Sequence, residues 1–293
     1  ITRTDSTHKR GNNGGKVTSN GYFQSAAKRH MNNSEGLDKS GRSDCKALGS
    51  RGEEMRAVVI GARGGIGAAL VSRLAECSSV SLVHALSREG LDGQAPKVVG
   101  GTINIEDENS IAAAALSVGA VSGSVDLIIL ATGLLHDKNG IRPEKSWKSL
   151  DGATLERTFR VNTIGPALLA KHFIPLLNRK KMSIFAALSA RVGSIEDNKL
   201  GGWDGYRASK AGLNMMIRGL AIELSRTHPK LACVALHPGT VDTNLSQPFQ
   251  RSVPGEQLKS AETCAFELLN VIEGLSPGDT GKFIAYDGTQ IPF

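Results

Sequence analysis

The sequence lacks the cysteine patterns of metal sites and disulfide-rich domains. Its 293 residues contain four cysteines, which are widely separated and form no Cys-x-x-Cys pair and no cluster with histidine. Scattered cysteines of this kind argue against a disulfide framework and against a zinc module. We therefore expect free thiols and no bound metal.

Long apolar runs are also absent. The longest, such as VDLIILA at 125–131, have the length of a buried strand, whereas a membrane-spanning helix needs about 20 apolar residues. The first residues are polar and basic, unlike a secretory signal. These features predict a cytoplasmic protein that makes no contact with a membrane.

Aromatic residues are scarce, at 4%, and the positive charge is unevenly distributed. The net charge is +7, of which residues 1–54 contribute +4 through ten Lys or Arg and six Asp or Glu. The other 239 residues carry only +3 and show no basic patch interleaved with aromatic residues. We therefore expect no nucleic-acid partner, although a basic tail that binds nucleic acid remains an alternative for 1–54.

Residues 1–54 are rich in Gly, Asn, Ser and Lys and show no apolar periodicity. A segment of this composition buries too little apolar surface to offset the entropy of ordering, so we predict a disordered basic N-terminal extension. Two alternatives stay open for its role. It is either a transit peptide for organellar import or sequence upstream of a functional start at Met55.

From Met55 onward, short apolar runs alternate with helical patterns. Two long helices are predicted at 154–177 and 206–226. Strand-like runs occur at 57–61, 80–87, 97–105, 126–133, 181–189, 231–239 and 281–288. This alternation predicts an α/β fold, a single-domain Rossmann-type doubly wound parallel sheet flanked by helices, over 55–293.

The first strand-like run ends in IGARGGIG, which places Gly61, Gly65 and Gly67 where a strand turns into a helix. Glycines permit a tight turn and a close backbone approach, and the helix N-terminus attracts a pyrophosphate. In a βα pattern, this turn predicts dinucleotide binding.

The end of the second strand-like run bears on the choice of cofactor. In ALSREG, Ser87 and Arg88 stand where an acid would bind a free ribose hydroxyl, and Arg63 adds a cation in the glycine turn. Arginine pairs with a 2′-phosphate, so NADP(H) is favoured over NAD(H). The alternative is that both arginines are ordinary surface charges.

Tyr206 and Lys210 are four positions apart in GGWDGYRASKAGLN, so they share one face of a predicted helix. A neighbouring ammonium favours the phenolate and lowers the pKa of a tyrosine. Ser189 ends a predicted strand at the sheet edge where doubly wound folds place ligands. Asn162 is an isolated polar residue in the preceding predicted helix.

Taken in order, the segments GARGGIG, VN, S…YRASK and HPGTVDT resemble the short-chain dehydrogenase/reductase family across 55–293. GGWDGYRASKAGLNM and FIAYDGTQIPF are most similar to its bacterial C-factor-type branch. The resemblance implies a catalytic tetrad. Tyr206 would be the acid or base, Lys210 would lower its pKa and bind the nicotinamide ribose, Ser189 would donate to the carbonyl oxygen, and Asn162 would hold a relay water.

The resemblance also implies a set of cofactor contacts and a mode of oligomerisation. A homo-oligomer would pair subunits through the helices at 154–177 and 206–226. The implied cofactor-binding residues are Gly61, Arg63, Gly65, Ile66, Gly67, Ser87, Arg88, Asn104, Ile105, Ala131, Gly133, Tyr206, Lys210, Pro238, Gly239, Val241 and Thr243.

The chain departs from the family pattern at several cofactor positions. LATG at 130–133 replaces the usual Asn-Asn-Ala-Gly, Ile60 replaces a threonine, and Asn104 replaces an aspartate. The loop between Ser189 and Tyr206 is longer than usual. Segments 191–203 and 244–260 are expected to line the substrate pocket, with Leu200, Trp203, Leu245 and Phe249 giving it a moderately apolar character.

These expectations converge on an NADP(H)-dependent carbonyl reductase or alcohol dehydrogenase acting on a small molecule. Two alternatives remain. One is a non-catalytic NADP(H)-binding signalling or scaffold protein with the same fold. The other is a nucleotide-sugar epimerase or dehydratase, for which the chain beyond HPG is short of a substrate domain.

Overall fold

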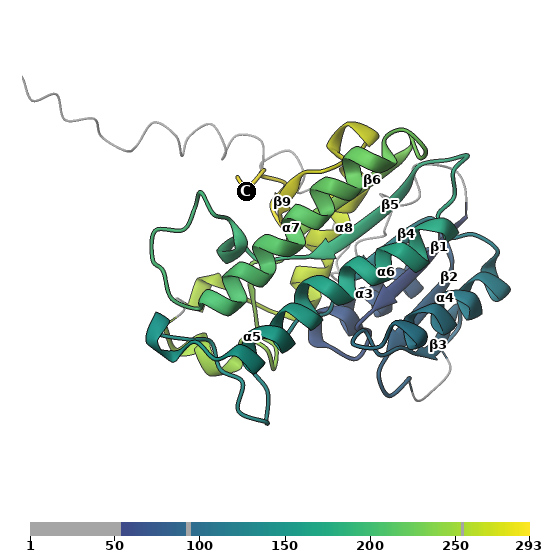
Figure 1. Ribbon diagram of the computed structural model, residues 1–293. Coiled ribbons are helices and arrows are strands. Elements are labelled where there is room, and N and C mark those ends of the chain that lie inside the picture. The colour runs from purple at the N-terminus through teal and green to yellow at the C-terminus, as the bar shows by residue number, and fades with distance from the viewer. Residues whose placement is uncertain (1–53, 92–94, 253–254) are drawn as a thin grey trace, which may run out of the picture. The chain divides into compact units, whose positions relative to one another are not determined.

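The computed structural model describes residues 54–91, 95–252 and 255–293 (Figure 1). The predictions made for residues 1–53 lie outside these ranges. Within them, a seven-stranded sheet has the order β3-β2-β1-β4-β5-β6-β9, and every neighbouring pair of its strands is parallel. The strands are β1 (Met55–Ile60), β2 (Val80–Ser87), β3 (Val98–Thr102), β4 (Leu127–Leu130), β5 (Ser183–Leu188), β6 (Leu231–His237) and β9 (Phe283–Ala285).

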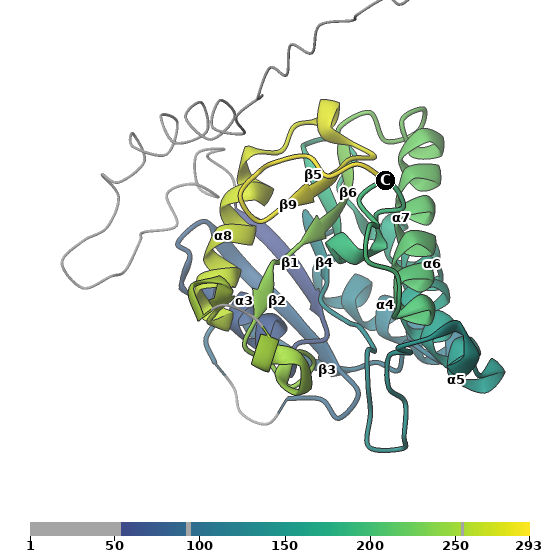
Figure 2. The same cartoon turned by 90° about the vertical axis from the view of Figure 1, so that its left-hand side faces the viewer.

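Helices cover both faces of this sheet (Figures 1 and 2). Helices α3 (Gly65–Glu76) and α8 (Ala261–Gly274) pack on one face, and α4 (Glu108–Ser122), α6 (Gly165–Phe173) and α7 (Asp204–Leu224) pack on the other. The central strands are buried on both faces, which explains their continuous apolar runs. The predicted α/β doubly wound fold is confirmed.

The order of the sheet reverses at its centre, between β1 and β4. Chain order runs outward from β1 through β2 to β3, and then resumes on the other side with β4, β5 and β6. Ligands of open α/β sheets bind beyond the carboxyl ends of the strands at such a switch point. The carboxyl ends of β1, β4 and β5, after Ile60, Leu130 and Leu188, therefore meet at one edge.

The long helix expected at 154–177 is interrupted. It consists of α5 (Gly152–Phe159), one π-helical turn (Arg160–Ile164), α6 and a final 3₁₀ turn (Ile174–Leu176). Single π-turns inside helices often mark functional sites, and this one contains Asn162. The helix expected at 206–226 is α7, displaced by two residues at each end.

Three further features of the described residues bear on what the sequence led us to expect. Cys233 and Cys264 are buried free thiols, as expected from the sequence. A two-stranded sheet of β7 (Thr240–Val241) and β8 (Leu258–Lys259) was not expected. No helix in the described part of the chain has the length and apolar character needed to cross a membrane.

Candidate active site

The glycine turn brings β1, α3 and β4 into close contact. Gly61 has a φ of +92°, and a Cβ built on it would lie 2.7 Å from the Ala131 carbonyl oxygen. A Cβ on Gly67 would overlap the carbonyl oxygen of Gly61. Side chains at these two positions would therefore force the strand and the helix apart.

No side chain caps the N-terminus of α3, and its first turn contains no acidic residue. Its leading amide groups and the positive end of its dipole thus face the carboxyl edge of the sheet. A pyrophosphate is the kind of group that such a terminus binds.

A cavity of about 380 Å³ lies beside this turn. Seven of the expected cofactor residues line it: Gly61, Arg63, Ser87, Arg88, Ile105, Ala131 and Gly133. Eleven lining residues were not anticipated: Ile60, Gly64, Glu89, Ile103, Glu106, Thr132, Leu134, His136, Asp137, Arg157 and Val161. Most of the second group follow the carboxyl ends of strands. This position is the feature of the sequence from which they could have been predicted.

The other cofactor residues lie outside this lining. Thr243 still reaches the glycine turn, since its Cγ2 atom would lie 2.7 Å from a Cβ on Gly65. Asn104 instead shapes the chain after β3, because its Oδ1 accepts from the Glu106 amide at 3.1 Å. The remaining residues of this group are Gly65, Ile66, Gly67, Tyr206, Lys210, Pro238, Gly239 and Val241.

The charges around the cavity are mixed rather than uniformly positive. Arg63 is 3.5 Å from Glu89, an acid that directly follows Arg88. Within the described ranges, Arg88 has no ion-pair partner. The expectation that no acid stands near the end of β2 therefore holds for Ser87 and Arg88 but overlooked Glu89.

At the far side of the cavity, one arginine bridges two acids. The Arg157 guanidinium is 3.5 Å from a carboxylate oxygen of Glu106 and 3.6 Å from one of Asp137. These residues come from three separate segments, so the bridge ties α5 to the chain after β3 and after β4.

Ser189 follows β5 and is held by a residue of α7. Its hydroxyl donates to Oδ1 of Asn214 at 2.7 Å, and both residues are buried. Sequence reasoning missed Asn214. The signal was its spacing, because Tyr206, Lys210 and Asn214 recur every four residues and therefore follow one face of the helix.

Tyr206 and Lys210 lie in the first two turns of α7, and both are buried. The Lys210 ammonium donates to the Leu188 carbonyl at 2.9 Å and lies 5.9 Å from the centroid of the Tyr206 ring. Burial raises the pKa of Tyr206 and lowers the pKa of Lys210 to about 8. In this arrangement desolvation outweighs the expected depression of the pKa of Tyr206.

Asn162 connects the π-turn to the chain after β4. Its Oδ1 accepts from the Leu134 amide at 2.8 Å, and its Nδ2 donates to the Leu134 carbonyl at 2.8 Å. Nδ2 also donates to the Ser209 hydroxyl at 3.0 Å, and that hydroxyl donates to the Tyr206 carbonyl at 2.8 Å. The side-chain amide of Asn162 is therefore occupied by its bonds to Leu134 and Ser209. A relay water would have to bind the main chain of the π-turn instead.

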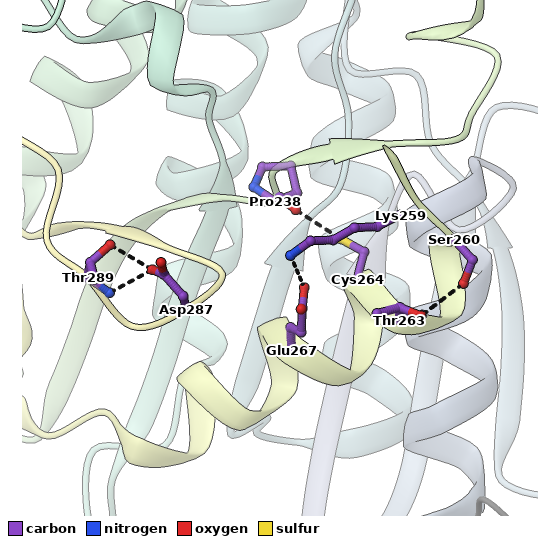
Figure 3. A network of polar contacts seen from close by, with 8 residues as sticks. All are labelled: Pro238, Lys259, Ser260, Thr263, Cys264, Glu267, Asp287 and Thr289. Atoms are coloured by element: carbon purple, nitrogen blue, oxygen red, sulfur yellow. Dashed lines mark hydrogen bonds and ion pairs between the residues drawn. The ribbon is translucent and has the colours of Figure 1, made fainter. Parts of the chain in front are cut away.

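The turn after β6 is held by the last part of the chain. Gly239 has a φ of +80°, and a Cβ there would lie 3.1 Å from the ring of Tyr286. The Cys264 thiol donates to the Pro238 carbonyl at 3.6 Å, and Lys259 pairs with Glu267 at 2.6 Å (Figure 3). β8 and α8 therefore support the turn from outside.

Aromatic rings gather near Tyr206. The Trp203 ring centroid is 6.4 Å from that of Tyr206 and 5.0 Å from that of Phe249, and His136 is 5.8 Å from Phe249. Trp203 and Phe249, two of the expected pocket residues, thus lie together beside Tyr206. Leu200 is 90% exposed and is not part of this aromatic cluster, so its place in the pocket stays a prediction.

Comparisons with known proteins identify the family. Residues 55–253 match the family model for short chain dehydrogenase. The chain is 31% identical over 183 residues to C-signal of Myxococcus xanthus, covering 61% of this chain and 99% of that protein. It is 31% identical over 236 residues to 1-hydroxy-2-glutathionyl-2-methyl-3-butene dehydrogenase of Rhodococcus sp., covering 79% and 96% respectively.

A solved structure gives the same result for the fold. The NADPH-bound carbonyl reductase from chicken fatty liver superposes with a TM-score of 0.71 and 26% identity, covering 82% of this chain and 95% of that one. The fold agrees with these relatives, because the sheet is parallel and reverses its strand order between β1 and β4. The segment matched by the family model agrees as well. The chain therefore belongs to the short chain dehydrogenase family of oxidoreductases.

Proposed function

We propose that the protein is an NADP(H)-dependent carbonyl reductase or alcohol dehydrogenase. The observation that carries the proposal is the position of the Lys210 ammonium. It binds the carbonyl of Leu188, next to Ser189, and would lie 3.6 Å from a Cβ on Gly133, which lines the cavity. The Tyr206–Lys210 pair therefore stands at the boundary between the cavity and the edge of the sheet.

The residues present fit a nicotinamide dinucleotide. The glycine turn allows no side chain at Gly61 or Gly67, and the α3 terminus is uncapped. The Thr132 hydroxyl, on the cavity wall, is buried without a hydrogen-bond partner among the described residues. When bound, the nicotinamide supplies or accepts a hydride. The chain would hold it through the glycine turn, Thr243 and Lys210.

In carbonyl reduction, Tyr206 would donate a proton to the oxygen of the substrate. Burial raises the pKa of its phenol, which keeps the proton in place at neutral pH. Ser189 would turn its hydroxyl from Asn214 toward the same oxygen as negative charge develops. In alcohol oxidation, Tyr206 would accept the proton only after losing its own, which its raised pKa disfavours.

NADP(H) preference is supported by Arg63 and Arg88, which line the cavity where the adenosine ribose is expected. Arg88, without an ion-pair partner in the described residues, is the better candidate for a 2′-phosphate. A moderately apolar carbonyl compound remains the proposed substrate class, because Trp203 and Phe249 lie around Tyr206.

Titration of NADPH and NADH against wild type and Arg88→Ala tests the cofactor. We expect Arg88→Ala to weaken NADPH binding about 10- to 100-fold, as expected for loss of a charged hydrogen bond, and to leave NADH binding unchanged. Arg226→Ala, which removes an exposed arginine on another part of the fold, is the matched control. Equal loss for both cofactors would contradict the assignment of Arg88.

NADPH oxidation across a panel of aldehydes and ketones tests the chemistry. Tyr206→Phe should abolish turnover while retaining NADPH binding, because only the hydroxyl is removed. Tyr286→Phe makes the same chemical change on the far side of the Pro238–Gly239 turn and should keep its activity. A Tyr206→Phe variant with normal turnover would refute the proposal.

The second candidate is a non-catalytic NADP(H)-binding signalling protein. The relative named C-signal, at 31% identity, favours it. Wild type that binds NADPH tightly and turns over no carbonyl or alcohol would support this alternative over the enzyme.

A further inference from the structure

Glu144 is a buried acid in the loop between β4 and α5. It is only 6% exposed, although glutamate is almost never buried without a partner. Among the described residues it takes part in no ion pair. Its partners are backbone groups at the beginning of α7.

Both the side chain and the main chain of Glu144 bind this segment. Oε2 accepts from the Gly205 amide at 3.2 Å, and the Glu144 carbonyl accepts from the Trp203 amide at 2.6 Å. A Cβ on Gly205 would lie 2.7 Å from Oε1 of Glu144 and 2.9 Å from Cδ2 of Leu155. The carboxylate therefore reaches the helix only because residue 205 is glycine.

Helix α7 needs such an acceptor because its own cap supplies none. The residue before it, Trp203, is left-handed with a φ of 57° and makes no side-chain capping bond. The first amides of a helix have no intrahelical acceptor, and a carboxylate there also suits the positive end of the dipole. Glu144 supplies this acceptor from a distant segment.

The amide that Glu144 binds belongs to the residue directly before Tyr206. We propose that Glu144 is a positioning residue, which accepts the Gly205 hydrogen bond and thereby sets the Tyr206 hydroxyl relative to Ser189 and Lys210. This inference rests on the proposed reductase reaction. The hydrogen bond, rather than a contact with substrate, is the means by which Glu144 acts.

The experiment compares Glu144→Ala and Glu144→Gln in the full chain, using 4-nitrobenzaldehyde as probe substrate and NADPH as cofactor. Misplacement of a reacting group by about 1 Å costs on the order of 100-fold. We therefore expect Glu144→Ala to lower kcat about 10- to 100-fold and to leave the NADPH Kd within about twofold. Glu144→Gln keeps an acceptor oxygen and should restore kcat to within about threefold of wild type.

Asp151→Ala is the matched control. Asp151 lies in the same loop region and accepts from the Thr154 amide at 2.8 Å, at the start of α5 rather than α7. Its loss removes an acidic helix cap of the same kind. We expect a lower melting temperature and an unchanged kcat.

Normal kcat in Glu144→Ala, or a Glu144→Gln variant no better than Glu144→Ala, would overturn the inference. If Glu144→Ala fails to fold, Gly205→Ala serves in its place, since the added methyl group displaces the carboxylate. It should lower kcat and spare NADPH binding, and normal kcat would again be contrary. Wild-type turnover is measured first: its absence would reject the proposed reaction and the inference together, whereas unchanged turnover in the variants rejects only the role of Glu144.

Discussion

At the scale of single residues, burial of the Lys210 ammonium destabilises the fold, although the proposed reaction needs this residue. Its ammonium is buried, and desolvation lowers its pKa to about 8 from 10.5. The folded state therefore loses its proton at lower pH than the unfolded chain does. Between pH 8 and 10.5 the unfolded chain holds more protons, so the free energy of unfolding rises with pH in this window.

Lys210→Met should therefore stabilise the protein. At pH 7 we expect a gain of about 3 kcal/mol in the free energy of unfolding, which should shrink as the pH rises from 8 toward 10.5. Urea denaturation at several pH values measures this, and turnover should be lost at all of them. A stability gain that stays constant over this pH range would contradict the role given to burial.

Glu89 lines the cavity beside Arg88 and was not anticipated from the sequence. Because it pairs with Arg63 beside Arg88, Glu89→Gln should tighten NADPH binding about two- to fivefold at low salt. The gain should fade as salt is added, and NADH should respond less. Glu76→Gln, at the other end of α3, is the control. Weaker NADPH binding in Glu89→Gln would show that the acid contacts the cofactor directly.

At the scale of elements, the π-turn joins the helix of Asn162 to the chain after β4. Asn162→Ala would leave both the amide and the carbonyl of Leu134 without their partner. We expect it to lower the free energy of unfolding by about 2–4 kcal/mol, because buried polar groups lose their hydrogen bonds. Urea denaturation checks this.

The control for this prediction is Asn178→Ala. Among the described residues, the Asn178 side chain accepts only from the Lys180 amide, in an exposed bond two residues along the chain. Its loss should therefore cost less than about 1 kcal/mol. Equal losses in the two variants would mean that the Leu134 bonds contribute little.

The elements themselves were largely predictable, and the reasons are physical. Strands buried on both faces read as apolar runs, and α7 shows its period clearly. The ends of α7 were located within two residues and those of the strands within three. The π-turn was not predicted, because RVNTI continues the helical pattern of the sequence. Tyr206 followed from its spacing to Lys210, and Ser189 from its place at the end of a strand. Glu144 left no local pattern, because its contact with Gly205 joins residues 61 positions apart.

At the scale of the whole molecule, the proposed homo-oligomer remains a prediction. Met215 on α7 is 70% exposed and Ile222, two turns further on, is 54% exposed. An apolar stripe of this kind suits helix pairing between subunits. We expect light scattering to give an oligomer for wild type and a monomer for Met215→Lys.

An oligomer of Met215→Lys with wild-type mass would place the interface elsewhere. Leu116→Lys is the control, because Leu116 lies on α4 and is similarly exposed, at 75%. That variant should keep the wild-type mass.

The pairing of the first and last helices of the sheet has a consequence for how the protein is made. Helix α3 packs against α8, and the Arg73 guanidinium donates to the Glu262 carbonyl at 3.1 Å. Thr243 likewise reaches Gly65. Helix α3 begins at Gly65 and α8 at Ala261, so during synthesis the glycine turn leaves the ribosome 196 residues before its covering helix. A nascent chain thus has its glycine turn exposed on one side until α8 has been made, and binding of the proposed cofactor would favour chains that include α8 over chains released before it.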